Sequence, residues 1–126
     1  MIKEILLVGL GGGVGSIFRY LTSVLVSKHC PSIFPWGTLV VNVIGCLLIG
    51  LLLGMIEKNQ LLSPGLRFLL VTGFCGGYTT FSTFALENVN LFNTQHSLTA
   101  ILYIAASILL GLLAVWGGLY LIKLFG

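Results

Sequence analysis

The chain has 126 residues, of which 57% are hydrophobic and only 7% are charged, and its mean hydropathy is +1.11. Roughly a quarter of the residues of a soluble domain are charged. Six Lys and Arg and three Glu side chains therefore cannot solvate the surface of a domain of this size. A soluble enzyme and a disordered segment are both disfavoured, and we predict a single integral membrane domain over residues 1–126. The net charge of +3 is spread along the chain, without the basic run that indicates a nucleic-acid partner.

The cysteines and the N-terminal stretch indicate packing rather than redox chemistry or targeting. Cys30, Cys46 and Cys75 are too few and too widely spaced for a disulfide framework, and none forms a CxxC motif. We expect them to be small apolar packing residues. The N-terminal apolar stretch resembles the core of a signal peptide, but it runs on too long, and we interpret it as a retained first helix.

Short polar or Pro-containing segments divide the chain into four apolar spans. We therefore predict an all-α membrane protein. The expected transmembrane helices cover residues of about 5–27, 36–56, 65–92 and 97–123. Each is roughly 20 residues or longer, which at 1.5 Å rise per residue crosses a hydrocarbon core of about 30 Å. The connections are short, so consecutive helices should be antiparallel neighbours.

The third span is irregular near its middle, where residues 73–80 contain three glycines and two threonines. Glycine costs about 1 kcal/mol per helical position, and threonine side chains compete for backbone hydrogen bonds. We expect a broken helix here, with Gly76 and Gly77 needing either a positive φ or a close approach of another chain segment. Unpaired backbone groups at membrane depth should then be buried in protein or line an ion site. The alternative is a continuous helix whose glycines only permit close packing.

Basic residues favour one of the two membrane faces only weakly. On the side of both termini lie Lys3, Lys58, Lys123 and Arg67, against Lys28 and Arg19 on the other. This is a weak positive-inside bias, and it permits insertion in both orientations. Four helices enclose little more than their own side chains, so a polar pathway would form more naturally between two copies. These features permit an antiparallel homodimer.

Polar residues within the spans are few, and hydrogen-bond donors dominate them. They are Arg19, Thr38, Asn42, Thr79, Thr80, Ser82, Thr83, Glu87, Tyr103 and Ser107. Intramembrane polar groups tend to face an interior or a water-filled path, and a donor-rich lining can replace the hydration shell of an anion. Phe81 and Phe84 share a helical face, and the positive edge of each ring could touch a small anion weakly enough to release it. Ordinary packing is the alternative for this pair.

Three motifs carry a resemblance to a known family: GGVGSIFRY at 12–20, GTLVVN at 37–42 and GFCGGYTTFSTF at 73–84. They closely resemble the Fluc/CrcB fluoride channel family in sequence and order. The resemblance implies a dual-topology homodimer of four-helix subunits in the plasma (inner) membrane, with two pores that pass fluoride passively out of the cell and relieve its toxicity. It also implies a structural Na⁺ at the dimer centre, bound by main-chain carbonyls of Gly76 and Thr79 from both third helices.

The resemblance also assigns side chains. The pore asparagine of the family corresponds to Asn42, and its two pore phenylalanines correspond to Phe81 and Phe84. The polar track of the family corresponds to Thr38, Ser82, Thr83, Tyr103 and Ser107. Arg19 matches an arginine of the first helix, and Glu87 matches a glutamate whose role stays open. Gly111 departs from the pattern, because some relatives carry serine there, which leaves that end of the track open.

Three other classes of protein compete with this interpretation. A dual-topology, proton-coupled exporter of the small multidrug type needs a mid-membrane carboxylate in its first helix, yet the only acid of that span is Glu4 at its start. An enzyme is not expected, because the glycine run at 9–15 does not satisfy GxGxxG, and His29 and His96 lie in loops without an acid or third-ligand partner. A purely structural subunit leaves the polar residues unexplained.

Overall fold

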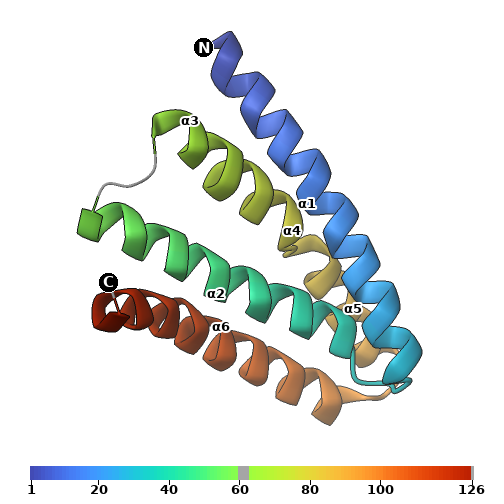
Figure 1. Ribbon diagram of the computed structural model, residues 1–126. Helices are drawn as coiled ribbons and strands as arrows, with labels where there is room; N and C mark the ends of the chain where they lie inside the picture. Colours follow the sequence, from blue (N-terminus) through green and yellow to red (C-terminus); the bar gives the residue numbers. More distant parts are fainter. Residues whose placement is uncertain (60–62, 126) are drawn as a thin grey trace.

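The computed structural model describes residues 1–59 and 63–125 of the chain, and every element in these ranges is helical (Figure 1). The elements are α1 (Ile2–His29), α2 (Trp36–Asn59), α3 (Pro64–Leu66), η1 (Arg67–Cys75), α4 (Gly76–Tyr78), α5 (Ser82–Asn93) and α6 (Ser97–Phe125). The segments α3, η1, α4 and α5 follow one another as the third span. Four helices are long and apolar enough to cross a membrane, which confirms the expected number of spans. The expected loop between the second and third spans includes residues 60–62, which lie outside the described residues.

The helices pack in two pairs, with α2 beside α6 and α1 beside η1 and α4 (Figure 1). Glycines allow both approaches: a Cβ at Gly11 or Gly15 of α1 would overlap the carbonyl oxygen of Leu69 or Phe74. A Cβ at Gly50 of α2 would likewise overlap a backbone carbonyl of α6. Lipid tails are as apolar as leucine, so close backbone packing of this kind is a main source of helix association in a membrane.

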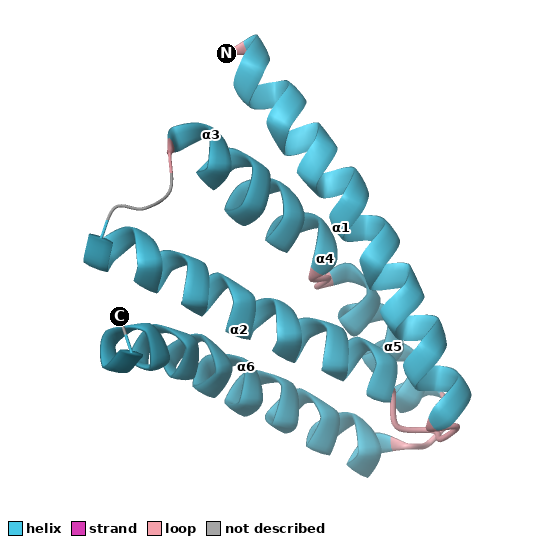
Figure 2. Ribbon diagram, viewed as in Figure 1, coloured by secondary structure: helices cyan, strands magenta, loops and turns pink. Residues whose placement is uncertain are grey.

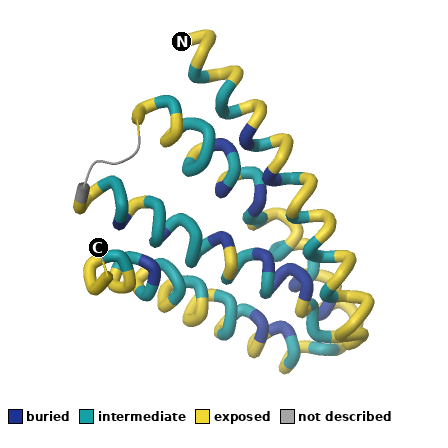
Figure 3. The backbone as a smooth tube through the Cα atoms, in the orientation of Figure 1, coloured by how far each residue is buried: buried dark blue, intermediate teal, exposed yellow. Residues whose placement is uncertain are grey.

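Burial is concentrated along the facing sides of the helices, and most outward positions are exposed (Figure 3). Leu39, Leu91, Ala100 and Tyr103 form a small buried cluster, in which Tyr103 and Ala100 have no exposed surface. Many large apolar side chains instead point outward, as expected where hydrocarbon is the surrounding solvent. The cluster lies where α2, α5 and α6 meet, and it positions the polar residues described below.

Helical structure stops after Tyr78 in the third span and resumes at Ser82 (Figure 2). Thr79 is extended, with φ −80° and ψ 159°, and the preceding η1 segment is a π-helix. No glycine among residues 1–59 and 63–125 has a positive φ. Of the two reasons given above for Gly76 and Gly77, a positive φ is therefore wrong. Close approach applies at Gly77 alone, because a Cβ there would overlap the Gly12 carbonyl oxygen, whereas the space at Gly76 is open.

Candidate ion site

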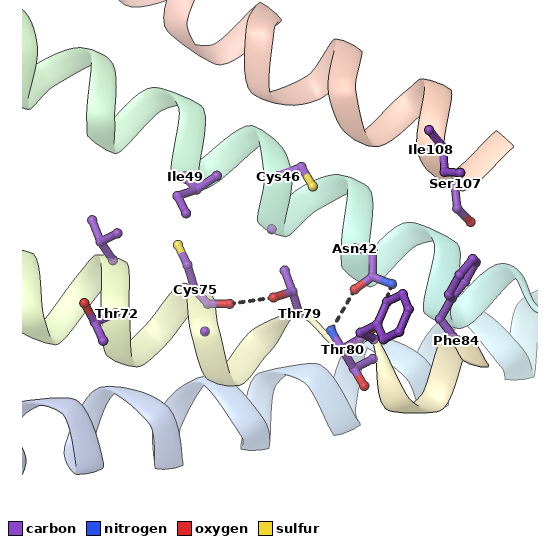
Figure 4. A pocket seen from close by; sticks show the side chains of 14 residues that line it. Asn42, Cys46, Ile49, Thr72, Cys75, Thr79, Thr80, Phe84, Ser107 and Ile108 are labelled. Atoms are coloured by element: carbon purple, nitrogen blue, oxygen red, sulfur yellow. Dashed lines mark hydrogen bonds between the residues drawn. The ribbon is translucent and has the colours of Figure 1, made fainter. Parts of the chain in front are cut away.

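A hollow of about 550 Å³ lies beside the interruption of the third span, with walls from α2, η1, α4, α5 and α6 (Figure 4). Six of the residues expected at the site line it: Asn42, Gly76, Thr79, Phe81, Phe84 and Ser107. The other expected residues are not part of its wall: Arg19, Thr38, Ser82, Thr83, Glu87 and Tyr103. The structure therefore divides the expected residues into a hollow and a neighbouring set.

The amide of Asn42 pairs with both backbone groups of Thr80. Asn42 Oδ1 accepts the Thr80 N–H at 2.8 Å, and Asn42 Nδ2 donates to the Thr80 carbonyl at 3.0 Å. Figure 4 shows the first of these contacts as a dashed line. A helix would supply these partners from its own backbone, so the Asn42 side chain replaces helical hydrogen bonds at the interruption. Sequence analysis proposed only a pore role for Asn42 and missed this one, because it depends on a contact between distant parts of the chain. The second N–H of the amide remains available.

Thr80 also begins the helix that follows. Its Oγ1 accepts the Thr83 N–H at 3.2 Å and lies 3.5 Å from Ser82 Oγ. A threonine hydroxyl that accepts the N–H three residues later is the usual cap of a helix N-terminus. Thr80 itself was therefore a sequence signal for the start of α5, because its hydroxyl can accept the backbone N–H of the residue three positions later. Ser82 and Thr83 themselves are exposed at this start.

The regular hydrogen bonding of the backbone carbonyls ends at the interruption. The Cys75 carbonyl accepts both the Thr79 N–H at 3.1 Å and the Thr79 hydroxyl at 3.0 Å. The Thr80 N–H, which would serve Gly76 in a continuous helix, donates to Asn42 instead. Within the part of the chain that the structure describes, the carbonyl of Thr79 at the interruption accepts no hydrogen bond. This oxygen lies at the C-terminal, partially negative end of a helix.

Glu87 binds two hydroxyl groups outside the hollow. Its Oε2 accepts the Thr38 hydroxyl at 2.9 Å, and its Oε1 accepts the Tyr103 hydroxyl at 2.8 Å. Thr38 is 5% exposed and Tyr103 is fully buried. Two residues expected along the polar track thus contact the carboxylate that sequence analysis left without a role. Hydrogen bonds to a charged acceptor are among the stronger ones in proteins.

Aromatic rings connect the Glu87 cluster to the hollow. The ring of Phe84 meets that of Tyr103 edge-on, with centroids 5.0 Å apart, and Phe81 lies 5.8 Å from Phe84. Phe81 is 78% exposed, whereas Phe84 is half-buried. The structure therefore brings the two phenylalanines together, as their spacing predicted, and gives each a different environment.

Ser107 and Arg19 carry polar groups without a partner. Ser107 Oγ is buried beside the hollow and has no hydrogen bond to any described residue. Arg19 is half-buried on α1 and forms no hydrogen bond or ion pair with the described part of the chain. A buried hydroxyl without a partner costs roughly 1–3 kcal/mol, so Ser107 is a position where a ligand or water would be stabilised.

The fold and the site define a multi-pass helical membrane protein with a small polar site between its helices. A family model described as CrcB-like protein, Camphor Resistance (CrcB), matches residues 6–119. The chain belongs to this family, and the resemblance stated from its motifs is confirmed.

Several named proteins are similar to the chain over nearly its whole length. "Fluoride-specific ion channel FluC" of Flavobacterium psychrophilum is 50% identical, with 96% of this chain and 98% of the relative covered. The protein of the same name from Azobacteroides pseudotrichonymphae is 45% identical, with coverage of 99% and 100%. That of Rhizobium meliloti is 45% identical, with coverage of 96% and 97%. These relatives are named as channels, not as enzymes.

Proposed function

We propose that the chain is a fluoride-selective channel of the plasma membrane, which lets fluoride leave the cell passively and so relieves fluoride toxicity. The observation that carries this proposal is identity of 45% to 50% over nearly the whole chain to relatives named fluoride-specific ion channels. The site is consistent with an anion, because its polar wall residues include an amide and hydroxyls but no carboxylate. No feature of the structure favours a proton-coupled exporter over a channel.

Donors at the hollow are the groups that we propose to contact fluoride. They are the second N–H of Asn42, the unpaired hydroxyl of Ser107, and the positive ring edges of Phe81 and Phe84. Fluoride is strongly hydrated, so these donors must replace water, yet ring edges bind weakly enough for release. The exposed hydroxyls of Ser82 and Thr83 would provide further hydrogen-bond donors for fluoride at the start of α5.

The Glu87 cluster serves the same purpose indirectly in this proposal. A free carboxylate near the path would repel an anion in a low dielectric. The hydroxyls of Thr38 and Tyr103 hold both carboxylate oxygens away from the wall of the hollow. The uncompensated charge of Arg19 would contribute the opposite effect and favour anions.

We also propose that two copies assemble as an antiparallel, dual-topology homodimer around a structural Na⁺. The main-chain carbonyl oxygens of Gly76 and Thr79 fit a hard cation, which prefers oxygen ligands. Two copies in opposite orientation would supply four such oxygens. No group of three His, Cys, Asp or Glu side chains that could hold a metal occurs in residues 1–59 and 63–125, so we assign the ligands to the main chain. Na⁺ would also make the surroundings positive.

Fluoride efflux from liposomes that contain only this protein tests the function. The expected result is rapid discharge of a fluoride gradient without a proton gradient, with chloride almost untouched. Flux that requires an imposed pH gradient would instead indicate a coupled exporter. Replacing Na⁺ with a large organic cation during purification tests the proposed Na⁺ separately. If the cation site can empty, the dimer or the fluoride flux should be lost.

A further inference from the structure

A second hollow, of about 490 Å³, lies at the other end of the helix pair α2–α6 and shares no wall residue with the ion site. We call it the end groove, and its wall contains Gly54, Lys58, Trp116, Leu119, Tyr120 and Lys123, together with the exposed carboxylate of Glu57. The C-terminal ends of α2 and α6 lie close together there (Figure 1). Both helices are long enough to span the membrane, so the end groove lies at the level of a membrane surface.

Lys58 is held in a fixed position at the end groove. Its Nζ donates to the carbonyls of Ile122 at 3.5 Å and Lys123 at 3.1 Å, in the last turn of α6. An ammonium at this place offsets the partial negative charge of the helix C-terminus. Lysine has three donors, so one N–H of Lys58 remains for a ligand. The ammonium of Lys123 lies in the same wall.

Trp116 and Tyr120 form the aromatic part of the groove. Their rings stack with centroids 6.0 Å apart, and their side chains are 66% and 52% exposed. Tryptophan and tyrosine prefer the headgroup level of a membrane, and an aromatic face attracts an organic ammonium. Leu119 and Gly54 give the wall an apolar part that acyl chains can contact.

We propose that the end groove binds one phospholipid whose headgroup carries both a phosphate and a primary ammonium, that is, phosphatidylethanolamine. Lys58 and Lys123 would bind the phosphate, while Glu57 and the aromatic pair bind the ammonium. The groove offers two cations and one carboxylate, and the headgroup offers an anion for the cations and a cation for the carboxylate. Phosphatidylglycerol has no ammonium for Glu57, and phosphatidylcholine has no N–H to donate to it. This inference does not depend on the proposed fluoride transport.

Fluorescence quenching of Trp116 by brominated phospholipids tests the proposal. Replacing the only other tryptophan with Trp36→Phe leaves Trp116 as the sole probe. In phosphatidylcholine vesicles with a minor brominated component, brominated phosphatidylethanolamine should quench Trp116 more strongly than brominated phosphatidylglycerol or phosphatidylcholine. Lys123→Gln should weaken this binding about fivefold, the effect of one basic residue near a membrane surface. Glu57→Gln should abolish the preference for phosphatidylethanolamine over phosphatidylglycerol.

Lys28→Gln is the matched control, because it removes the same charge at the end of α1, outside the end groove. It should leave quenching unchanged. Lys58→Gln is avoided, since it would also remove the bonds at the end of α6. Native mass spectrometry of the full chain with equal amounts of the three lipids gives a second readout that needs no tryptophan. Equal retention of the three, or an effect of Lys28→Gln as large as that of Lys123→Gln, would overturn the proposal.

Discussion

The two halves of the third span differ in the contacts that mainly hold them in place. The half before the interruption, η1 and α4, packs on α1 through glycines, with backbone against backbone. The half after it, α5, is attached by polar side chains, since Glu87 binds Thr38 of α2 and Tyr103 of α6. Asn42 joins the two at Thr80. Close backbone packing on α1 is the main contact of the first half, which also donates one hydrogen bond from Tyr78 to Thr22. The second half adds the packing of Leu91 to the hydrogen bonds of Glu87. The interruption therefore lies between two segments whose main contacts differ.

This arrangement places the end of α4 and the start of α5 beside the same hollow. The negative end of α4 and the capped start of α5 lie next to each other at residues 78–82. A cation would be stabilised by the first and an anion by the second. The difference between the two anchors predicts how each half responds to substitution.

The largest effect is expected where backbone meets backbone. Gly77→Val adds a side chain that overlaps the Gly12 carbonyl oxygen, so α4 must separate from α1 and the fold should be lost. Gly76→Val is its matched control, because the space at Gly76 within one copy is open. Gly76→Val should retain helical content and thermal stability of the monomer, and should disturb only a dimer or ion contact. Circular dichroism and size-exclusion chromatography distinguish these outcomes. Equal loss of fold in both variants would refute the assignment of the close contact to Gly77.

The next effect concerns the joint between the halves. Asn42→Asp replaces the N–H that donates to the Thr80 carbonyl with an oxygen, which sets a charged acceptor against another acceptor. We expect a loss of about 2–4 kcal/mol in the free energy of unfolding, together with nearly complete loss of fluoride flux. Asn90→Asp makes the same chemical change at an exposed position near the end of α5, where it breaks no side-chain hydrogen bond to a described residue, and it should cost less. Normal stability and normal flux in Asn42→Asp would show that Asn42 neither holds the interruption in place nor contacts fluoride.

A smaller loss is expected from the single hydroxyl groups of α2 and α6 that bind Glu87 of the second half. Tyr103→Phe and Thr38→Val each leave one oxygen of Glu87 without its donor, and each should cost about 1–3 kcal/mol of unfolding free energy. Denaturant titration in detergent measures this. In a Glu87→Gln background the cost of each should fall, because the charge that strengthens both bonds is absent. If the cost stays the same in that background, packing of the two residues rather than their bonds to Glu87 accounts for it.

The sequence was sufficient to predict the four spanning helices, because their hydropathy and the polar segments between them depend only on local composition. It favoured a broken third helix but left a continuous one as the alternative, since the glycines at 73–77 suit both. What interrupts the hydrogen bonding is Asn42, which lies 38 residues from Thr80. The family resemblance assigned Thr38 and Tyr103 to a polar track, but their partner Glu87 lies 49 and 16 residues away. Contacts of this range follow from tertiary packing and leave no local pattern.

The smallest predicted effect is a gain in stability at the end of the second half. Gln95 has φ 63°, a left-handed conformation that costs a residue with a side chain about 1 kcal/mol. The surrounding bonds require it, because the Gln95 N–H donates to the Phe92 carbonyl at 3.3 Å and the His96 N–H donates to the Leu91 carbonyl at 2.8 Å. This is the pattern of a helix end that favours glycine. Gln95→Gly should therefore raise the free energy of unfolding by about 0.5 kcal/mol.

The matched control is Asn93→Gly, at the last residue of α5, where φ is helical and glycine should destabilise by a similar amount. A gain of stability in Gln95→Gly and a loss in Asn93→Gly, at two positions so close together, would show that the effect comes from backbone conformation rather than from side-chain contacts. Thermal unfolding of both variants in the same detergent measures the difference. The bonds that hold Glu87 and Thr80 are not altered by either change, so flux through the protein should stay at the wild-type level. A loss of stability in Gln95→Gly would show that the Gln95 side chain contributes more than its strained backbone costs.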